Sequence, residues 1–420
     1  MDRRVSALVI LILGIAAGVV SAAEQLQKGD YVAVVGDSIT EQRKYSLYIE
    51  EYLTMCQPAG ELKQTQFGWS GETSWGFESR MQNDMLRFKP TVATTCFGMN
   101  DGAYSPMNEQ KAARYREAQT KIVQEMKKAG VRFIVVGSPG CVDVQTFRNR
   151  NHALAEMYNK TLASLRDISK EVADKEGVGF ADVFDPMLDV MTKAEAKHGE
   201  QYHVCGPDGV HPDNNGHLVM AYAFLKGLGC TGDIGTITFD LTSNKAEATE
   251  GHKVLSASDG SVEIESTRYP FCFYGDPART DSTRGVLEFL PFNQDLNRFI
   301  LVVKNPGARK VKVTWGSASK EFDGAQLEKG INLAAEFLTN PFSGPFKKLE
   351  DQISRKQELE TPLVKRTINQ IPQVVKSSPA AKDALERAAT DGIAADKDLQ
   401  TAVSASVVPV KHTIKIEAVK

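Results

Sequence analysis

Between residues 31 and 230, short apolar runs alternate with longer stretches in which apolar residues recur every three or four positions. The runs YVAVVG, LKQTQFG, TVATTCFG, RFIVVG and VGFADV predict strands, and the stretches around 109–130 and 151–177 predict amphipathic helices. Parallel strands need a crossover between them, which a helix usually supplies. The alternation therefore predicts an α/β fold, a doubly wound parallel sheet with helices on both faces, whose ligands bind at the carboxyl ends of the strands.

The pattern changes after Cys230. Short β-type segments separated by Gly, Pro, Asn and Asp predict a small β-rich accessory unit over residues 232–335. Charged helical segments dominate residues 336–420, which close on a strand-like run, HTIKIEAV. We expect this later part of the chain to shape substrate binding and to supply no catalytic group.

The N-terminal residues have the layout of a secretory signal peptide. Arg3 and Arg4 precede an uncharged apolar stretch that closes on small residues at 21–23. A retained membrane anchor is the alternative, but the Gly and Ala content and the small-residue exit favour cleavage. We therefore predict a signal peptide over 1–23 and a secreted or periplasmic protein without a stable membrane anchor.

The six cysteines stand at positions 56, 96, 141, 205, 230 and 272. In an oxidising compartment some of them could pair. Cys96 lies inside the apolar run TVATTCFG and is expected to be a buried free thiol. No Cys-x-x-Cys spacing occurs, which removes the usual zinc-ribbon and thioredoxin-type motifs.

Composition and charge narrow the class of partner. With 42% hydrophobic and 25% charged residues, the chain has ordinary globular composition. Its formal net charge at pH 7 is -3 over 420 residues. A nucleic-acid binder needs a concentrated basic surface that this balance does not supply, so we expect no nucleic-acid partner and favour a small or neutral substrate.

Four short stretches that follow predicted strands carry candidate chemistry. They are GDSI at 36–39, WSGETS around Gly71, GMND around Asn100, and DGVH with Asp208 and His211. Each is weak alone, because Gly, Asn and Asp are common in turns and Ser38 after a strand could merely cap the next helix. The open question is whether Ser38 is a nucleophile or a cap.

Taken together and in this order, the four stretches resemble the SGNH, or GDSL-type, hydrolases over about residues 30–230. The resemblance implies a flavodoxin-like SGNH fold in which Ser38 is the nucleophile, His211 its general base and Asp208 the carboxylate that orients the imidazole. It also implies an oxyanion hole made by the backbone N–H groups of Ser38 and Gly71 and by the side-chain amide of Asn100. Ile39 stands where the family name has leucine, a conservative apolar change.

The chemistry asks for these residue types independently. A serine hydroxyl is a weak nucleophile until an adjacent base takes its proton, and that base needs a partner that fixes its tautomer. The alkoxide of the tetrahedral intermediate needs preorganised donors, which a close glycine backbone and a neutral amide can supply. These steps need no cofactor.

Four other side chains near the motifs have weaker interpretations. Asp37 is expected to bond nearby backbone N–H groups, and His217 is expected to be a packed or capping histidine. Trp69 and Trp75 flank Gly71, where they could stack on a sugar ring or fill the core, and the sequence leaves both open.

Five side chains between 198 and 213 could be drawn as metal ligands, but their spacing matches no standard metal motif, so we predict no metal site. They are His198, His203, Cys205, His211 and Asp213.

The sequence therefore predicts a secreted serine esterase that acts on a small-molecule or polysaccharide ester. The resemblance permits carbohydrate acetylesterases, lipases, thioesterases and arylesterases. Because no long apolar lid lies near the motifs and a β-rich unit follows them, deacetylation of a carbohydrate is favoured. The alternatives are a lipase- or thioesterase-type hydrolase, and a catalytically inactive glycan-binding envelope protein, against which the intact motif set speaks.

Overall fold

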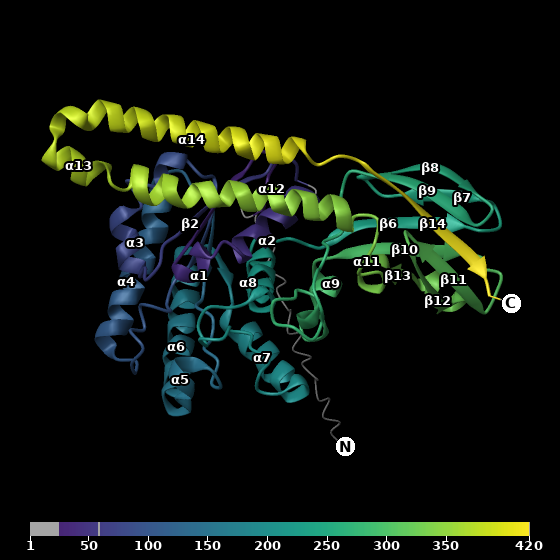
Figure 1. The fold of residues 1–420 in the computed structure, drawn as a ribbon, viewed down its shortest axis with the longest axis horizontal. Helices are drawn as coiled ribbons and strands as arrows, with labels where there is room; N and C mark the ends of the chain where they lie inside the picture. Colours follow the sequence, from purple (N-terminus) through teal and green to yellow (C-terminus); the bar gives the residue numbers. More distant parts are fainter. Residues whose placement is uncertain (1–24, 58, 420) are drawn as a thin grey trace, which may run out of the picture.

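A five-stranded parallel sheet with strand order β2-β1-β3-β4-β5 lies at the centre of residues 31–230 (Figure 1). The computed structural model describes residues 25–57 and 59–419, so the predicted signal peptide at 1–23 lies outside the described residues. The strands coincide with the five predicted apolar runs: β1 Tyr31–Gly36, β2 Lys63–Gly68, β3 Val92–Cys96, β4 Phe133–Gly137 and β5 Gly179–Ala181.

Two groups of helices flank this sheet. Helices α3, α4 and α6 follow β2, β3 and β4 and pack together, whereas α2, α7 and α8 form the second group. This strand order and the helical crossovers are those of a flavodoxin-like doubly wound sheet, so the predicted fold class is confirmed. The helices and turns are α1 Ser38–Glu41, α2 Tyr45–Glu51, η2 Tyr52–Cys56, α3 Ser74–Arg80, η3 Met85–Phe88, α4 Glu109–Lys128, α5 Phe147–Arg150, α6 His152–Glu176, α7 Phe184–His198 and α8 Asn214–Gly227.

Two further sheets follow, with orders β13-β10-β6-β7 and β12-β11-β14-β9-β8. The last strand, β14, comes from the end of the chain and lies between β9 and β11, antiparallel to both (Figure 1). Alternate β14 residues are buried, so one face of this strand packs against the core and the other faces outward. The strands are β6 Asp233–Asp240, β7 Lys245–Ala248, β8 His252–Ser258, β9 Ser261–Ser266, β10 Arg298–Lys304, β11 Lys310–Trp315, β12 Ala318–Asp323, β13 Ile331–Asn332 and β14 Val410–Ala418.

Long helices α12 and α14 run side by side across the parallel sheet, on the side of its edge strand β2 (Figure 1). An edge strand exposes unpaired backbone groups, and α12 satisfies two of them with buried side chains. Lys356 Nζ donates to the Gln64 carbonyl at 2.7 Å, and the Gln66 N–H donates to Glu360 at 2.9 Å. The C-terminal helices therefore complete the sheet that carries the motifs.

Apart from the long helices α12 and α14, the helices after residue 230 are short. They are η4 Gly285–Glu288, α9 Phe292–Asp295, α10 Gly324–Lys329, α11 Leu333–Glu336, α12 Ser343–Pro362, η5 Leu363–Ile368, α13 Ile371–Ser377, η6 Pro379–Ala381 and α14 Lys382–Ala405. Across residues 25–57 and 59–419, none of the helices combines the length and apolar character that a membrane crossing requires.

All six cysteines are buried free thiols, which confirms the prediction for Cys96. The possibility of pairing left open by the sequence is not realised. Two of these thiols are in contact: the sulfur atoms of Cys141 and Cys205 lie 3.7 Å apart.

Candidate active site

The turn from β1 into α1 places Ser38 at the carboxyl end of the central sheet. Gly36 ends the strand where a Cβ would lie 2.8 Å from the Cys96 carbonyl oxygen, so only glycine fits. Asp37, not Ser38, is the N-cap of α1, because its Oδ1 accepts the Ile39 N–H at 2.9 Å. The structural role predicted for Asp37 is thus confirmed, and the Ser38 hydroxyl is released from capping.

The hydroxyl of Ser38 lies within hydrogen-bond distance of His211, which is far away in the sequence. Ser38 Oγ lies 2.8 Å from His211 Nε2, and His211 Nδ1 lies 2.6 Å from Asp208 Oδ2. The other oxygen of Asp208 accepts the backbone N–H groups of Val210 and His211, each at 2.9 Å. Ser38 is therefore hydrogen-bonded to a histidine 173 positions further along the sequence, which is in turn bonded to Asp208.

The pKa shifts of Asp208 and His211 favour one arrangement of protons among these three side chains. Burial raises the pKa of Asp208, but the hydrogen bonds from His211 and from the backbone outweigh it and lower this pKa to about 2. The bond to Asp208 raises the pKa of His211, and partial burial opposes the rise. An ionised Asp208 can only accept, so Nδ1 of neutral His211 carries the hydrogen and Nε2 is free to accept from Ser38.

The two other predicted site residues lie in adjoining loops. The Glu72 N–H donates to the Trp69 carbonyl at 3.1 Å, and Gly71 occupies the third position of this turn with φ of +75°. Such a turn favours glycine there, because other residues strain at positive φ. Asn100 Nδ2 donates to the Glu72 carbonyl at 3.0 Å, which joins the two loops. Their role as oxyanion donors stays a prediction.

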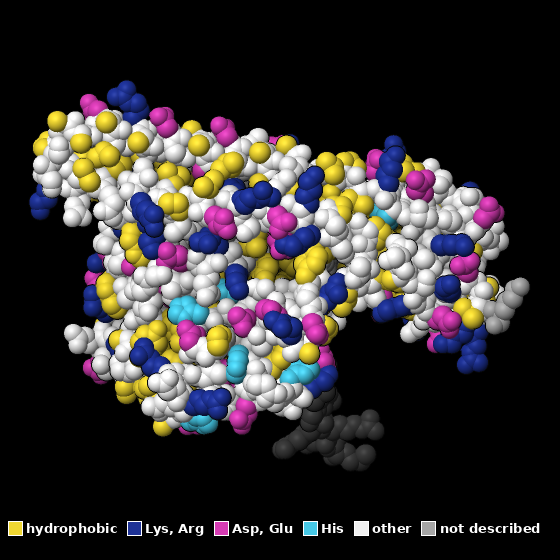
Figure 2. Space-filling model, in the orientation of Figure 1, with side chains coloured by type: hydrophobic (Ala, Val, Ile, Leu, Met, Phe, Trp, Pro, Cys, Tyr) yellow, Lys and Arg dark blue, Asp and Glu magenta, His cyan; other side chains and the backbone are white. Residues whose placement is uncertain are grey.

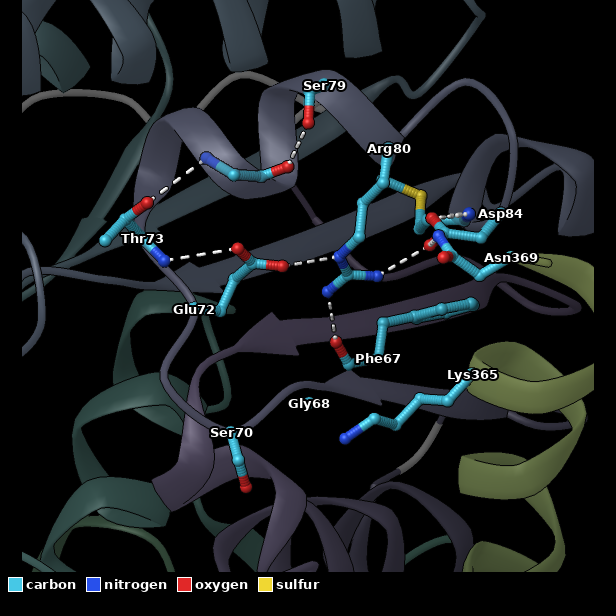
Figure 3. Close-up of polar contacts among 12 residues, drawn as sticks. Phe67, Gly68, Ser70, Glu72, Thr73, Ser79, Arg80, Asp84, Lys365 and Asn369 are labelled. Atoms are coloured by element: carbon cyan, nitrogen blue, oxygen red, sulfur yellow. Dashed lines mark hydrogen bonds and ion pairs between the residues drawn. The ribbon is translucent and has the colours of Figure 1, made fainter. Parts of the chain in front are cut away.

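A buried ion-pair network stiffens the loop after β2 (Figure 3). Arg80 Nε donates to Glu72 at 2.6 Å, and Nη1 donates to Asp84 at 2.7 Å. The same guanidinium reaches the Phe67 carbonyl at 3.1 Å. These residues were not predicted from the sequence, although Arg80 and Asp84 have the i, i+4 spacing of a helical ion pair.

A second ion pair, from the C-terminal region, also stabilises this loop. Lys365 in η5 donates to Glu41 of α1 at 2.6 Å, and its Nζ lies 4.7 Å from the centre of the Trp69 ring. Glu41 also accepts from the backbone and hydroxyl of Ser70. Figure 3 shows Lys365 pointing toward the strand end at Gly68. One lysine therefore links α1, which begins with Ser38, to the loop that holds Gly71.

Two cavities meet at the Ser38–His211–Asp208 chain. The larger, of about 620 Å³, and the smaller, of about 460 Å³, both include His211 and Asp208 in their walls. Ser38 lines only the smaller cavity, together with polar groups such as Gln42 and Lys44. The histidine thus stands on the wall between the two cavities.

Neither predicted tryptophan lines these two cavities. Arg80 and Lys365 approach the ring of Trp69, with the Arg80 Cζ atom 4.8 Å from its centre. The Arg114 guanidinium carbon lies 3.7 Å from the centre of the Trp75 ring. Both rings are engaged by cations, and a role in substrate stacking stays a prediction.

The remaining candidates have structural environments. His217 is buried, and its Nε2 lies 2.7 Å from Gln42 Oε1, as expected for a packed histidine. His203 Nδ1 lies 3.6 Å from the buried Asp143 carboxyl group. Within the described part of the chain, no cluster of three or more His, Cys, Asp and Glu side chains is arranged to hold a metal ion.

Comparison with known proteins agrees with the motif resemblance. Residues 34–219 match the GDSL-like Lipase/Acylhydrolase family. This part of the chain is similar to that family, and the match supports a serine ester hydrolase of the GDSL type. No curated protein matches the sequence.

Solved structures resemble this one to different extents. BT4096, a gut microbial diltiazem-metabolizing enzyme, has a TM-score of 0.72 and 22% sequence identity, covering 94% of this chain and 100% of that chain. A catalytic mutant of Axe2, an acetylxylan esterase from Geobacillus stearothermophilus, has a TM-score of 0.40 and 20% identity, covering 49% of this chain and 96% of that chain. The first likeness shows that the whole architecture, accessory sheets and long helices included, occurs in another protein.

Proposed function

We propose that Ser38, His211 and Asp208 form a catalytic triad that hydrolyses a carboxylic ester. The observation that carries the proposal is the continuous chain from Ser38 Oγ through both nitrogens of His211 to Asp208, with links of 2.8 and 2.6 Å. This is the arrangement that a serine nucleophile requires, with a base within reach and a carboxylate that fixes the tautomer of the base.

The reaction follows from these positions. His211 Nε2 takes the proton of Ser38 as the hydroxyl oxygen attacks the ester carbonyl carbon. The tetrahedral oxyanion is held by the N–H groups of Ser38 and Gly71 and by the second amide hydrogen of Asn100, since the first bonds to Glu72. His211 then protonates the departing alcohol, and water releases the acid from Ser38 by the same steps in reverse.

We further propose that the ester is a short one, an acetyl group on a carbohydrate. Most residues that line the two cavities have polar or charged side chains, and the apolar residues are few: Tyr104, Pro207, Val210 and Pro212. A long acyl chain would lie against charged and amide groups whose hydration it removes, at a cost in free energy. A sugar alcohol can instead exchange hydrogen bonds with them, and this favours a carbohydrate over a lipid.

The test compares Ser38→Ala with Ser164→Ala, a control on α6 whose hydroxyl bonds to the Lys160 carbonyl. We expect Ser38→Ala to lose nearly all hydrolysis of p-nitrophenyl acetate and all labelling by a fluorophosphonate, while the control keeps both. Activity of Ser38→Ala within about tenfold of the parent would refute the triad. Faster turnover of p-nitrophenyl octanoate than of the acetate would refute the short-acyl assignment.

We also propose that the protein is exported, on the sequence pattern of residues 1–23. The expected mature chain begins after Ala23. N-terminal sequencing of the protein from its native host tests this, and an intact N-terminus in the cytoplasmic fraction would contradict it.

A further inference from the structure

The larger cavity beside His211 presents two arginines that the triad does not use. Arg148 and Arg150 lie in α5 and line this cavity together with Tyr104 and His203. The guanidinium carbon of Arg148 lies 4.2 Å from the centre of the Tyr104 ring. Stacking on an aromatic face orients a guanidinium while leaving its N–H donors free at the edge.

The backbone under these arginines is held in an unusual conformation. Arg148, Asn149 and Arg150 have successive φ values of 43°, 62° and 63°. Consecutive left-handed residues other than glycine are unfavourable and persist where the surroundings hold them, which is common at binding sites. Phe147 anchors the segment, because its ring is buried and stacks with Tyr158 at 6.0 Å.

The two arginines have no carboxylate partner in the part of the chain that the structure describes. Among residues 25–57 and 59–419, neither Arg148 nor Arg150 forms an ion pair with a carboxylate. Asp208 lines the same cavity, but its oxygens accept from His211 and Val210. The other nearby carboxyl group, Asp143, is buried behind His203, and burial raises its pKa and so disfavours its charged form.

Position relative to His211 decides which part of a substrate would meet these arginines. Ser38 lines the smaller cavity only, whereas His211 borders both. In ester hydrolysis His211 Nε2 gives its proton to the departing alcohol oxygen, so the alcohol component lies against His211 and can extend into the larger cavity that this histidine also borders. A cavity of about 620 Å³ is large enough for a sugar residue.

We propose that this cavity binds a carboxylate on the alcohol component of the ester, so that the preferred substrates are acetylated oligosaccharides that contain uronic acid. The proposal rests on the proposed function and names its substrate class. Two guanidinium groups that have no carboxylate partner among the described residues match a substrate carboxylate, which they bind through paired N–H donors. The acetyl group then lies at Ser38, and the acid group of the same or a neighbouring sugar lies against Arg148 and Arg150.

The kinetic test uses two matched substrates, acetylated trigalacturonate and the same compound with its carboxyl groups converted to primary amides. We expect the wild type to have a kcat/KM ratio of about tenfold or more in favour of the acid, from the strength of charge-assisted hydrogen bonds. The ratio should fall toward one in Arg148→Gln/Arg150→Gln. Arg309→Gln, in the turn before β11, is the control and should keep the wild-type ratio.

High salt gives a test without any substitution, because it screens exposed ion pairs and should reduce the wild-type ratio. A ratio near one in the wild type, or an unchanged ratio in the double variant, would overturn the proposal while leaving the esterase intact. So would a preference for a sulfated, carboxyl-free substrate over the carboxylated one.

A binding measurement separates this proposal from the proposed function. If the wild type hydrolyses no ester, the triad proposal fails, and calorimetric titration with deacetylated trigalacturonate still tests the cavity. Salt-sensitive binding that is weakened about tenfold or more in the double variant supports the carboxylate site. Absence of binding, or equal binding by the wild type and the double variant, overturns it.

Discussion

Replacing Lys356 by methionine tests whether the C-terminal helices are an integral part of the fold that carries the active site. Lys356 lies in α12 with its side chain 1% exposed. Its ammonium lies 3.0 Å from Glu50 of α2 and also bonds to Glu360 and to the Gln64 carbonyl of the edge strand. Methionine keeps most of the volume and removes the charge, so it isolates the electrostatic contribution.

The magnitude follows from what the substitution leaves behind. Glu50 and Glu360 are 5% and 0% exposed, and both would lose their only cation among the ion pairs of the described residues. Removing one partner of a buried ion pair costs about 3–5 kcal/mol. Lys170→Met, which breaks a solvent-exposed pair with Asp174 on α6, should cost below about 1 kcal/mol and is the control.

The cost should depend on pH in a stated direction. Burial raises the pKa of Glu360 to about 8, and Lys356 opposes this rise. A carboxyl group whose pKa is higher in the folded than in the unfolded protein binds its proton more tightly when folded, so its contribution to stability is lost as the pH rises through the folded-state value. Without Lys356 the pKa of Glu360 rises further, so the stability of the variant keeps falling above pH 8, where that of the parent levels off. The deficit of Lys356→Met should therefore be larger at pH 9 than at pH 7.

Urea unfolding followed by circular dichroism and by tryptophan fluorescence measures both variants against the parent. Because β2 leads directly into the loop of Gly71, ester hydrolysis in the same urea series should be lost no later than the first unfolding transition. A Lys356→Met deficit no larger than that of Lys170→Met, or one that does not change between pH 7 and pH 9, would refute the reasoning.

Three further predictions concern the reaction. The kcat/KM for p-nitrophenyl acetate should increase with pH as His211 loses its proton, because His211 must be neutral to act as a base. The midpoint of this increase should lie above pH 6.5, because Asp208 raises the pKa of His211. Asp208→Asn should move the midpoint to lower pH and lower kcat by about 10³ to 10⁴. Asn100→Ala should lower kcat by about 10² to 10³ in initial-rate assays, and a loss below about fivefold would count against its role as an oxyanion donor. Lys365→Met should lower kcat about tenfold with little change in KM, because the ion pair with Glu41 positions α1. Lys365→Arg should restore kcat. Equal kcat in the parent and in Lys365→Met would show that this ion pair has no part in turnover.

Much of the parallel-sheet region could be predicted from the sequence because its signals are local. The five predicted runs became five strands, of which β1 to β4 are largely buried, and the loops after β1, β2 and β3 carry Ser38, Gly71 and Asn100. The carboxyl ends of parallel strands meet at one edge, so motifs in these loops converge once the fold class is known. Asp208 and His211 are three residues apart, and one turn holds both.

The arrangement of charges could not be predicted in this way. A net charge of -3 favoured a small or neutral substrate, yet Arg148 and Arg150 line the cavity next to His211. Net charge records how many ionised groups a chain has and not where they lie. The conformation that holds these arginines depends on Phe147 packing against Tyr158, a contact with no sequence motif.

The sequence by itself determined the α/β fold class and the motifs of a serine ester hydrolase, because strand burial, helical periodicity and turn residues are written in neighbouring positions. Only the tertiary structure decided that β14 enters the accessory sheet between β9 and β11, and that α12 completes the edge of β2. Glu360 accepts the N–H of Gln66 across 294 residues of chain, and Lys365 reaches Glu41 across 324. Such contacts depend on the packing of the whole chain, since no local pattern tells a buried charged side chain which distant backbone group it will satisfy.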